Sequence, residues 1–208
     1  MSGSSYDKSD YWAVKAKKEG YPARSVYKLM ELDAKFGLVK PGMRILDVGA
    51  APGSWTLWTL RRLAGTGFLA AVDLQSLGIS PKDANFAFVR GDINDPAIRE
   101  TLAAYGPYDL VLSDAAPSTS GNSGLDTDRS EALVETVMDC AEALLKTGGS
   151  LVAKLFVGGG ERAILDRMRS GFATARGFKP EACRSVSFET YLVAVGRKKK
   201  EYRIQNTE

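Results

Sequence analysis

Short apolar segments alternate with longer helical segments along most of this 208-residue chain. This alternation constrains the fold more than any other feature of the sequence. The apolar segments predict strands at Met43–Val48, Gly67–Val72, Phe86–Val89, Tyr108–Leu112 and Ser150–Phe156. Helical patterns follow four of them, at about Ser54–Leu63, Pro96–Tyr105, Asp128–Leu145 and Glu161–Phe172. This order predicts an α/β fold of the doubly wound, Rossmann-like type, with a mainly parallel sheet.

The two ends of the alternation differ from its middle. Lys179–Ser185 and Tyr191–Val195 predict a last pair of strands, which adds one antiparallel strand near the C-terminus. Before the first strand, Ser25–Phe36 predicts a helix that Ser25 can cap. The residues before Ser25 are polar and charged, and we expect them to be frayed or weakly helical.

Basic residues gather at both termini. Residues 1–40 hold 8 basic and 5 acidic residues, residues 197–208 hold 5 and 2, and the 156 residues between hold 15 and 18. Basic ends on a mildly acidic body favour contact with a polyanion, although solvated charged tails are common. We expect a basic, partly disordered extension at 1–24, a folded domain at 25–197 and a basic tail at 198–208.

The chain contains no histidine. Ser-His-Asp catalysis, Cys-His catalysis and histidine-ligated zinc are therefore excluded, and proton transfer must use carboxylates, lysine, tyrosine, cysteine or water. Cys140 and Cys183 predict two buried reduced thiols and no metal site. No apolar run approaches the roughly 18 residues of a membrane helix, and residues 1–18 hold no signal-peptide stretch. We expect a cytoplasmic monomer that does not enter a membrane.

A glycine-rich turn follows the first predicted strand, over Asp47–Trp55. Gly49 and Gly53 allow a ligand to approach the backbone closely, and the next helix begins with free N–H groups. The spacing is not that of a dinucleotide-binding fingerprint. Pro52 also removes one N–H donor that a pyrophosphate would need. The turn therefore predicts a site for a cofactor without phosphates.

Three carboxylates follow the predicted strand ends, at Asp73, Asp92 and Asp114. Asp73 is placed to accept both hydroxyls of an adenosine ribose, and Asp92 the adenine amino group, with Ile93 against the ring. Strand-end aspartates also often cap turns, so each one alone has a plain structural alternative. Asp95 is better explained as a helix cap, as is either Asp126 or Asp128. Together the three carboxylates predict an acidic crevice that suits the cationic S-adenosylmethionine.

Lys154 lies inside the apolar strand Leu151–Phe156. A charged lysine is costly to bury in a central strand, so the side chain either extends to an edge or has a function. In a doubly wound sheet, the end of this strand lies beside the end of the preceding one, and therefore beside Asp114. In a chain without histidine, Lys154 is the natural candidate to accept a proton from a hydroxyl as it attacks a methyl group.

At these residues the chain resembles the FtsJ/RrmJ-type ribosomal RNA 2′-O-methyltransferases. The resemblance extends from about Arg24 to Lys199 and implies a class I methyltransferase sheet. Its markers are the segments Arg24–Leu29, Asp47–Trp55, Ser113–Pro117, Val152–Phe156 and Ser187–Leu192.

The family uses a Lys-Asp-Lys-Glu tetrad, which the resemblance assigns to Lys28, Asp114, Lys154 and Glu189. It implies that Lys154 deprotonates or orients a ribose 2′-hydroxyl, that Asp114 and Lys28 tune and hold it, and that Glu189 supports the site. The implied partner is a uridine of large-subunit (23S) ribosomal RNA within the assembled subunit.

The resemblance also implies a set of cofactor contacts, to S-adenosylmethionine. They fall on Gly53, Trp55, Asp73, Asp92 and Asp114, beside Gly49, Pro52 and Ile93 from the loop and strand ends.

The sequence departs from the family pattern in two places. The loop Ser118–Thr127 differs, and fewer arginines precede Glu189 in the stretch Arg184–Phe188. The tetrad is intact, so these departures bear on the RNA partner and not on the chemistry. The same chemistry on transfer RNA is the main alternative, and a non-catalytic ribosome assembly factor is a second. A small-molecule methyltransferase leaves the basic termini and Lys28 unexplained.

Overall fold

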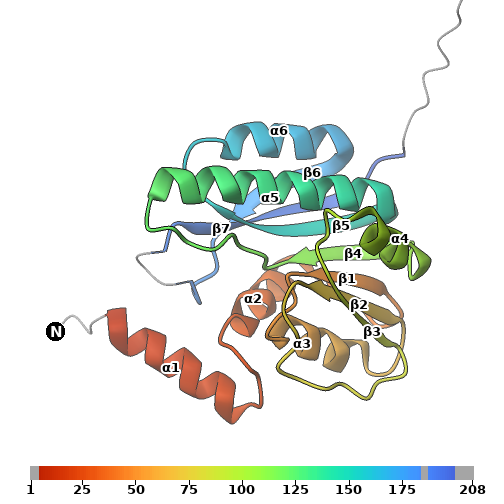
Figure 1. Cartoon of the computed structure of the whole chain (residues 1–208), viewed down its shortest axis with the longest axis horizontal. Coiled ribbons are helices and arrows are strands. Elements are labelled where there is room, and N and C mark those ends of the chain that lie inside the picture. The colour runs from red at the N-terminus through yellow and green to blue at the C-terminus, as the bar shows by residue number, and fades with distance from the viewer. Residues whose placement is uncertain (1–4, 184–186, 200–208) are drawn as a thin grey trace, which may run out of the picture.

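The computed structural model describes residues 5–183 and 187–199, with side chains from residue 11 onward. It contains one seven-stranded sheet between two layers of helices (Figure 1). The strands are β1 Arg44–Val48, β2 Phe68–Asp73, β3 Phe86–Arg90, β4 Tyr108–Ser113, β5 Leu145–Phe156, β6 Phe172–Phe178 and β7 Glu189–Arg197. The helices are α1 Ser5–Lys18, α2 Val26–Phe36, α3 Ser54–Leu63, α4 Pro96–Ala104, α5 Ser123–Leu144 and α6 Glu161–Gly171.

The strand order is β3-β2-β1-β4-β5-β7-β6, and β7 runs antiparallel to both of its neighbours. The other neighbouring pairs, from β3 to β5, are parallel. The predicted doubly wound, mainly parallel sheet with one antiparallel strand is therefore confirmed. Because the order turns back on either side of β1, the ends of β1 and β4 form the switch point at which such sheets bind ligands.

Alternate side chains of the strands enter two separate cores. On one face, α4, α5 and α6 pack against Val72, Val111 and Leu155 and their neighbours. On the other face, α1, α2 and α3 pack against Leu112 and Val152 and their neighbours. Since both faces are covered, the central strands are apolar almost throughout, as expected for a parallel sheet. No helix among the described residues is long and apolar enough to cross a bilayer.

The predicted strand at Lys179–Ser185 is wrong. Residues 179–183 form a turn, and residues 184 and 185 lie outside the described residues. The backbone N–H groups of Glu181 and Ala182 donate to the Glu31 carboxylate of α2, at 2.6 and 2.9 Å, instead of to a neighbouring strand. The strand that pairs with β7 on its outer side is β6, which follows α6 directly.

Two predicted helix caps are also wrong. Ser25 makes no side-chain capping hydrogen bond and lies in the right-handed helical region. Helix α5 starts at Ser123, and its cap is Asn122, so neither Asp126 nor Asp128 caps it. By contrast, Asp95 does cap α4, because its carboxylate accepts the N–H of Ala97 at 2.9 Å.

The N-terminal stretch forms helix α1 over Ser5–Lys18. Ala16 is buried in the second core, and the Trp12 ring lies 4.7 Å from the ring of Tyr27 in α2. The Tyr27 hydroxyl donates to Glu19, at 2.9 Å, just after α1. These contacts hold α1 against the residue that precedes Lys28.

Candidate active site

The glycine-rich loop between β1 and α3 is held from two sides. The N–H groups of Gly49 and Ala50 donate to the Val72 carbonyl of β2, at 2.9 and 3.2 Å. On the other side, a Cβ added to Gly49 would lie 2.6 Å from the Cα of Ala115, and Gly49 has a φ of +74°. A side chain at Gly49 would therefore meet backbone, so the loop and the end of β4 can approach this closely only with glycine.

A pocket of about 320 Å³ opens at the carboxyl ends of β1 to β4. Of the residues predicted to bind a cofactor, those that line it are Gly49, Asp73, Asp92, Ile93 and Asp114. Among the residues that the structure describes, those that line the pocket include no lysine or arginine. A wall with three carboxylates suits a cationic ligand and disfavours a phosphate, even though Asp114 also pairs with Lys154.

Asp73 and Asp92 also shape their own turns. Asp73 accepts the N–H of Ala51 on one oxygen and the N–H of Gln75 on the other, at 2.9 and 2.8 Å. One oxygen of Asp92 accepts the backbone and side-chain N–H groups of Asn94, at 2.8 and 3.0 Å. The structural and the functional interpretations are compatible here, because each carboxylate oxygen has two lone pairs.

The four tetrad residues come together as two buried ion pairs beside this pocket. Lys154 Nζ lies 3.1 Å from Asp114 Oδ1, and Lys28 Nζ lies 2.7 Å from Glu189 Oε1. These side chains are 9–16% exposed. They come from α2, the end of β4, and the facing strands β5 and β7.

The sequence of the chain matches the profile of one family over residues 21–197, described as FtsJ-like methyltransferase. The chain is 50% identical to the ribosomal RNA large subunit methyltransferase E of Treponema denticola, over 94% of this chain and 98% of that protein. The chain belongs to the FtsJ-like methyltransferase family.

Other relatives agree with the family. This FtsJ-like chain is 44% identical to the ribosomal RNA large subunit methyltransferase E of Treponema pallidum, over 91% of this chain and 94% of that protein. A ribosomal RNA methyltransferase from Plasmodium falciparum superposes with a TM-score of 0.77 at 26% identity, over 86% of this chain and all of that one. Human methyltransferase-like protein 13, crystallised with SAH, shares the fold alone, at a TM-score of 0.57 and 16% identity.

Tyr191 connects the two ion pairs of this FtsJ-like site. Its hydroxyl donates to Asp114 Oδ1 at 2.6 Å, and Lys28 Nζ lies 5.9 Å from the centre of its ring. Burial, and then the negative charges of Asp114 and Glu189, raise the pKa of Tyr191 well above its ordinary value, so the hydroxyl stays a donor. Sequence reasoning missed Tyr191, which resembled an ordinary apolar strand residue.

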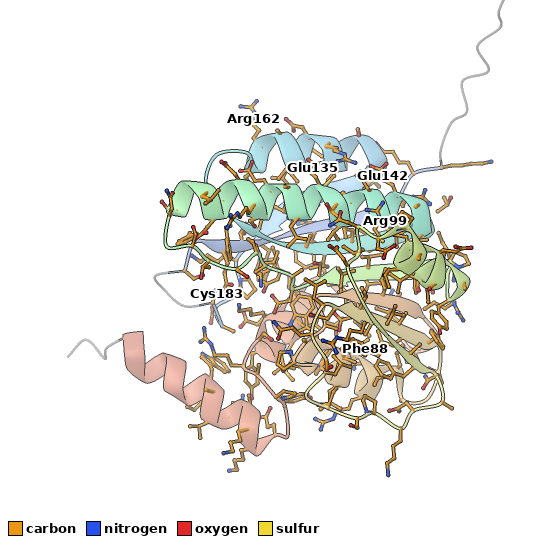
Figure 2. The ribbon with its side chains drawn as sticks, viewed as in Figure 1. Phe88, Arg99, Glu135, Glu142, Arg162 and Cys183 are labelled. Carbon is orange, nitrogen blue, oxygen red and sulfur yellow. The ribbon has the colours of Figure 1, made fainter. Side chains whose placement is uncertain are left out.

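Glu189 and Cys183 are in contact on the α2 side of the sheet, where Figure 2 marks Cys183. Burial acts to raise the pKa of Glu189, but the charge and hydrogen bond of Lys28 outweigh it and the pKa is lowered. Burial, followed by the Glu189 charge, raises the pKa of Cys183 to about 12. Cys140 and Cys183 are both free and buried, which confirms the prediction of two buried reduced thiols.

Three residues predicted to contact a cofactor do not line the pocket: Pro52, Gly53 and Trp55. Gly53 precedes α3 with a φ of +110°, and a Cβ there would strike Ile79. Trp55 is buried, with its indole N–H donating to the Ser25 carbonyl at 2.9 Å and its ring 5.7 Å from that of Tyr191. Direct contact of these residues with a cofactor stays a prediction.

The far wall of the pocket includes Ser118 and Leu133, which the sequence did not single out. The segment that carries Ser118 is tied to α5, because the backbone N–H and the hydroxyl of Ser120 both donate to Asp126, each at 2.7 Å. Asp126 therefore fixes a pocket wall instead of capping the helix. The backbone and side-chain hydrogen bonds from Ser120 lower the pKa of Asp126, which keeps it ionised.

Asp47 is a buried carboxyl beneath the glycine-rich loop. One oxygen accepts the Thr56 hydroxyl at 2.7 Å, and the other has no hydrogen-bond partner among the described residues. Burial raises the pKa of Asp47 to about 7, with smaller contributions from the charges of Asp114 and Asp73 and an opposing one from the Thr56 bond.

Proposed function

We propose that this FtsJ-like chain transfers a methyl group from S-adenosylmethionine to the 2′-hydroxyl of a uridine ribose in large-subunit ribosomal RNA. One observation carries the proposal: Asp114 belongs to the wall of the acidic pocket and to the ion pair with Lys154 at the same time. A cofactor in that pocket and a hydroxyl at Lys154 would therefore meet at Asp114. The names of the relatives at 50% and 44% identity support a ribosomal RNA substrate.

The residues of the pocket fit the proposed cofactor. Asp73 and Asp92 supply acceptors for ribose hydroxyls and an adenine amino group, and Gly49 keeps the floor open for close approach. When bound, S-adenosylmethionine supplies an electrophilic methyl group on a cationic sulfur, which the surrounding carboxylates favour.

Lys154 is the residue that handles the hydroxyl. Its ammonium group faces the carboxylate of Asp114 at 3.1 Å and donates to the Asp114 carbonyl at 2.5 Å. In its neutral amine form, Lys154 would keep two N–H groups for these contacts and present its lone pair to the ribose hydroxyl. It would hold that oxygen in line and take its proton as the new carbon–oxygen bond forms and the methyl–sulfur bond of the cofactor breaks. Positioning of this kind can lower a barrier by about 7–11 kcal/mol.

The second ion pair completes the site. Glu189 holds Lys28 at 2.7 Å beside the ring of Tyr191, and Tyr191 in turn fixes the Asp114 carboxylate that orients Lys154. The last turn of α1 carries three lysines, Lys15, Lys17 and Lys18, and comes before Lys28 in the chain. Their positive charges suit contact with the phosphates of an RNA strand. We propose that the monomer acts in the cytoplasm on the assembled large subunit.

The test is to map ribose methylation in cells with and without the gene. The proposal expects one large-subunit uridine to lose its methyl group. In vitro, purified protein should methylate large subunits from the deletion strain. Transfer only to transfer RNA would establish the main alternative instead. Complete ribose methylation in the deletion strain, with altered subunit assembly, would favour the assembly factor.

A further inference from the structure

An exposed aromatic side chain directly precedes Glu189 of the tetrad. Phe188 is 47% exposed, whereas Glu189 beside it is buried. The Phe188 ring lies 5.6 Å from the Phe156 ring in an edge-on arrangement, and its carbonyl accepts the Val157 N–H at 2.8 Å. The end of β5 therefore holds Phe188 in place while nearly half of its surface stays exposed.

Phe188 lies within a nucleoside's reach of Lys154. In the β5–β7 pairing, Phe156 is opposite Glu189 and Lys154 is opposite Tyr191. Residues two apart on a strand share a face and are about 7 Å apart. Lys154 and Phe156 therefore lie next to each other on one face of β5. Because the Phe188 ring contacts the Phe156 ring, Phe188 is the next side chain beyond Phe156 on that side.

The charges around Phe188 are those of a nucleic-acid contact. Lys154 lies near the end of β5, and Lys28 of α2 pairs with Glu189, the residue after Phe188. Lys179 donates to the Ser187 carbonyl at 2.6 Å, next to Phe188. Val157, which is 42% exposed, continues the apolar surface. Aromatic faces between cationic groups bind single-stranded nucleic acids, because the bases stack while the cations meet the phosphates.

We infer that Phe188 stacks on the nucleobase of the nucleotide whose ribose lies at Lys154. This inference rests on the proposed RNA methyl transfer and adds a base-binding subsite to it. Stacking fixes the nucleoside at its base, so that the 2′-hydroxyl meets the lysine.

The test compares Phe188→Ala, Phe188→Leu and Phe188→Tyr in methyl transfer to large subunits from a deletion strain. Stacking predicts that Ala and Leu both lose about 5- to 150-fold in kcat/KM for the RNA, because stacking on an aromatic contributes about 1–3 kcal/mol per base. Tyr should stay close to the wild type. The Kd for S-adenosylmethionine should not change in any of the three variants.

Val195→Ala is the matched control, because Val195 is an exposed apolar residue of β7 at the opposite end of the strand. It should leave kcat/KM unchanged. If Leu restores full activity, Phe188 only packs against Phe156, and the inference is overturned. Full activity of Phe188→Ala overturns it as well. A wild-type protein that methylates no RNA overturns the proposed function and this inference together, whereas an active wild type with an unaffected Ala variant overturns the inference alone.

Discussion

Lys154 and Asp114 are joined by two contacts through a single ammonium group. Removal of the Lys154 amino group should abolish its proton transfer. The cofactor pocket should keep its shape, because Lys154 does not line it. We expect Lys154→Ala to lower kcat by about 10²–10⁴-fold, the usual contribution of a positioned proton acceptor. Lys154→Arg should be equally inactive, because a guanidinium keeps its protons. Single-turnover methyl transfer and calorimetric cofactor binding measure the two effects.

Lys146 provides the matched control for that experiment. It lies on the same strand, β5, and its ammonium group is 2.8 Å from Asp109 in a half-exposed pair. Exposed ion pairs contribute about 0–1 kcal/mol, so Lys146→Ala should transfer methyl groups nearly as fast as the wild type. Equal activity of the Lys154 and Lys146 variants would contradict the role assigned to Lys154.

Asp47 should make the stability of the protein depend on pH. Its pKa in the folded protein, about 7, lies above the ordinary value of 3.8, so the folded state binds this proton more tightly than the unfolded chain. The resulting cost of folding is absent below about pH 4 and grows as the pH rises to 7.

Asp47→Asn removes this cost. The stability of the variant relative to the wild type should therefore rise between pH 4 and 7 and then level off. The rise should be at most about 4 kcal/mol, at roughly 1.4 kcal/mol per pKa unit. Urea unfolding at a series of pH values measures it, and a difference that does not vary with pH would refute the assignment.

Among the elements, the loop between β1 and α3 depends on its contact with the end of β4. Gly49→Ala places a Cβ 2.6 Å from the Cα of Ala115, and backbone cannot move aside as a flexible side chain would. The loop or the Asp114 segment must shift, and both line the pocket. We expect the Kd for S-adenosylmethionine to rise at least about tenfold, which corresponds to roughly 1.4 kcal/mol.

Gly37→Ala separates this clash from the cost of the backbone conformation. Gly37 ends α2 with a φ of +62°, and a Cβ there would meet nothing within 4 Å. Ala in the left-handed region costs about 1–3 kcal/mol of stability wherever it occurs. The Gly37 variant should therefore unfold at a lower urea concentration and still bind the cofactor with the Kd of the wild type. A weakened Kd in both variants would mean that general destabilisation explains the Gly49 result.

At the scale of the molecule, α1 and α6 lie on opposite sides of the sheet (Figure 1), and α1 carries exposed positive charges. Lys17 and Lys18 are both exposed in the last turn of α1, which packs beside α2 and its Lys28. If they contact phosphates, Lys17→Ala with Lys18→Ala should weaken RNA binding and reduce the slope of log affinity against log salt by about 1–2. The Kd for the cofactor should not change.

Arg162→Ala with Arg169→Ala removes two charges from α6 and serves as the control. Arg162 is 93% exposed at the side of the molecule opposite α1 (Figure 2). This pair should leave the salt dependence unchanged. The same loss of slope in both double variants would indicate an effect of net charge and not a contact made by α1.

By itself, the sequence determined the α/β alternation, the carboxylates at the ends of the strands and the odd placement of Lys154. These features are local: apolar periodicity, turn residues and one charge in an apolar strand can be read within a few residues. The β6 strand, Phe172–Phe178, was missed because Thr174, Arg176 and Gly177 interrupt its apolar residues and weaken the pattern. The turn at residues 179–183 was missed because its N–H groups bond to Glu31, some 150 residues away.

Only the tertiary structure decided which residues meet. Tyr191 and Asp114 are 77 residues apart in the chain, and their hydrogen bond depends on the strand order and on the register of β5 with β7. The same packing directed Trp55 toward Tyr191 instead of the pocket and left one oxygen of the buried Asp47 without a hydrogen-bond partner in the described part of the chain. Such contacts arise from how whole elements pack, and no short stretch of sequence contains that information.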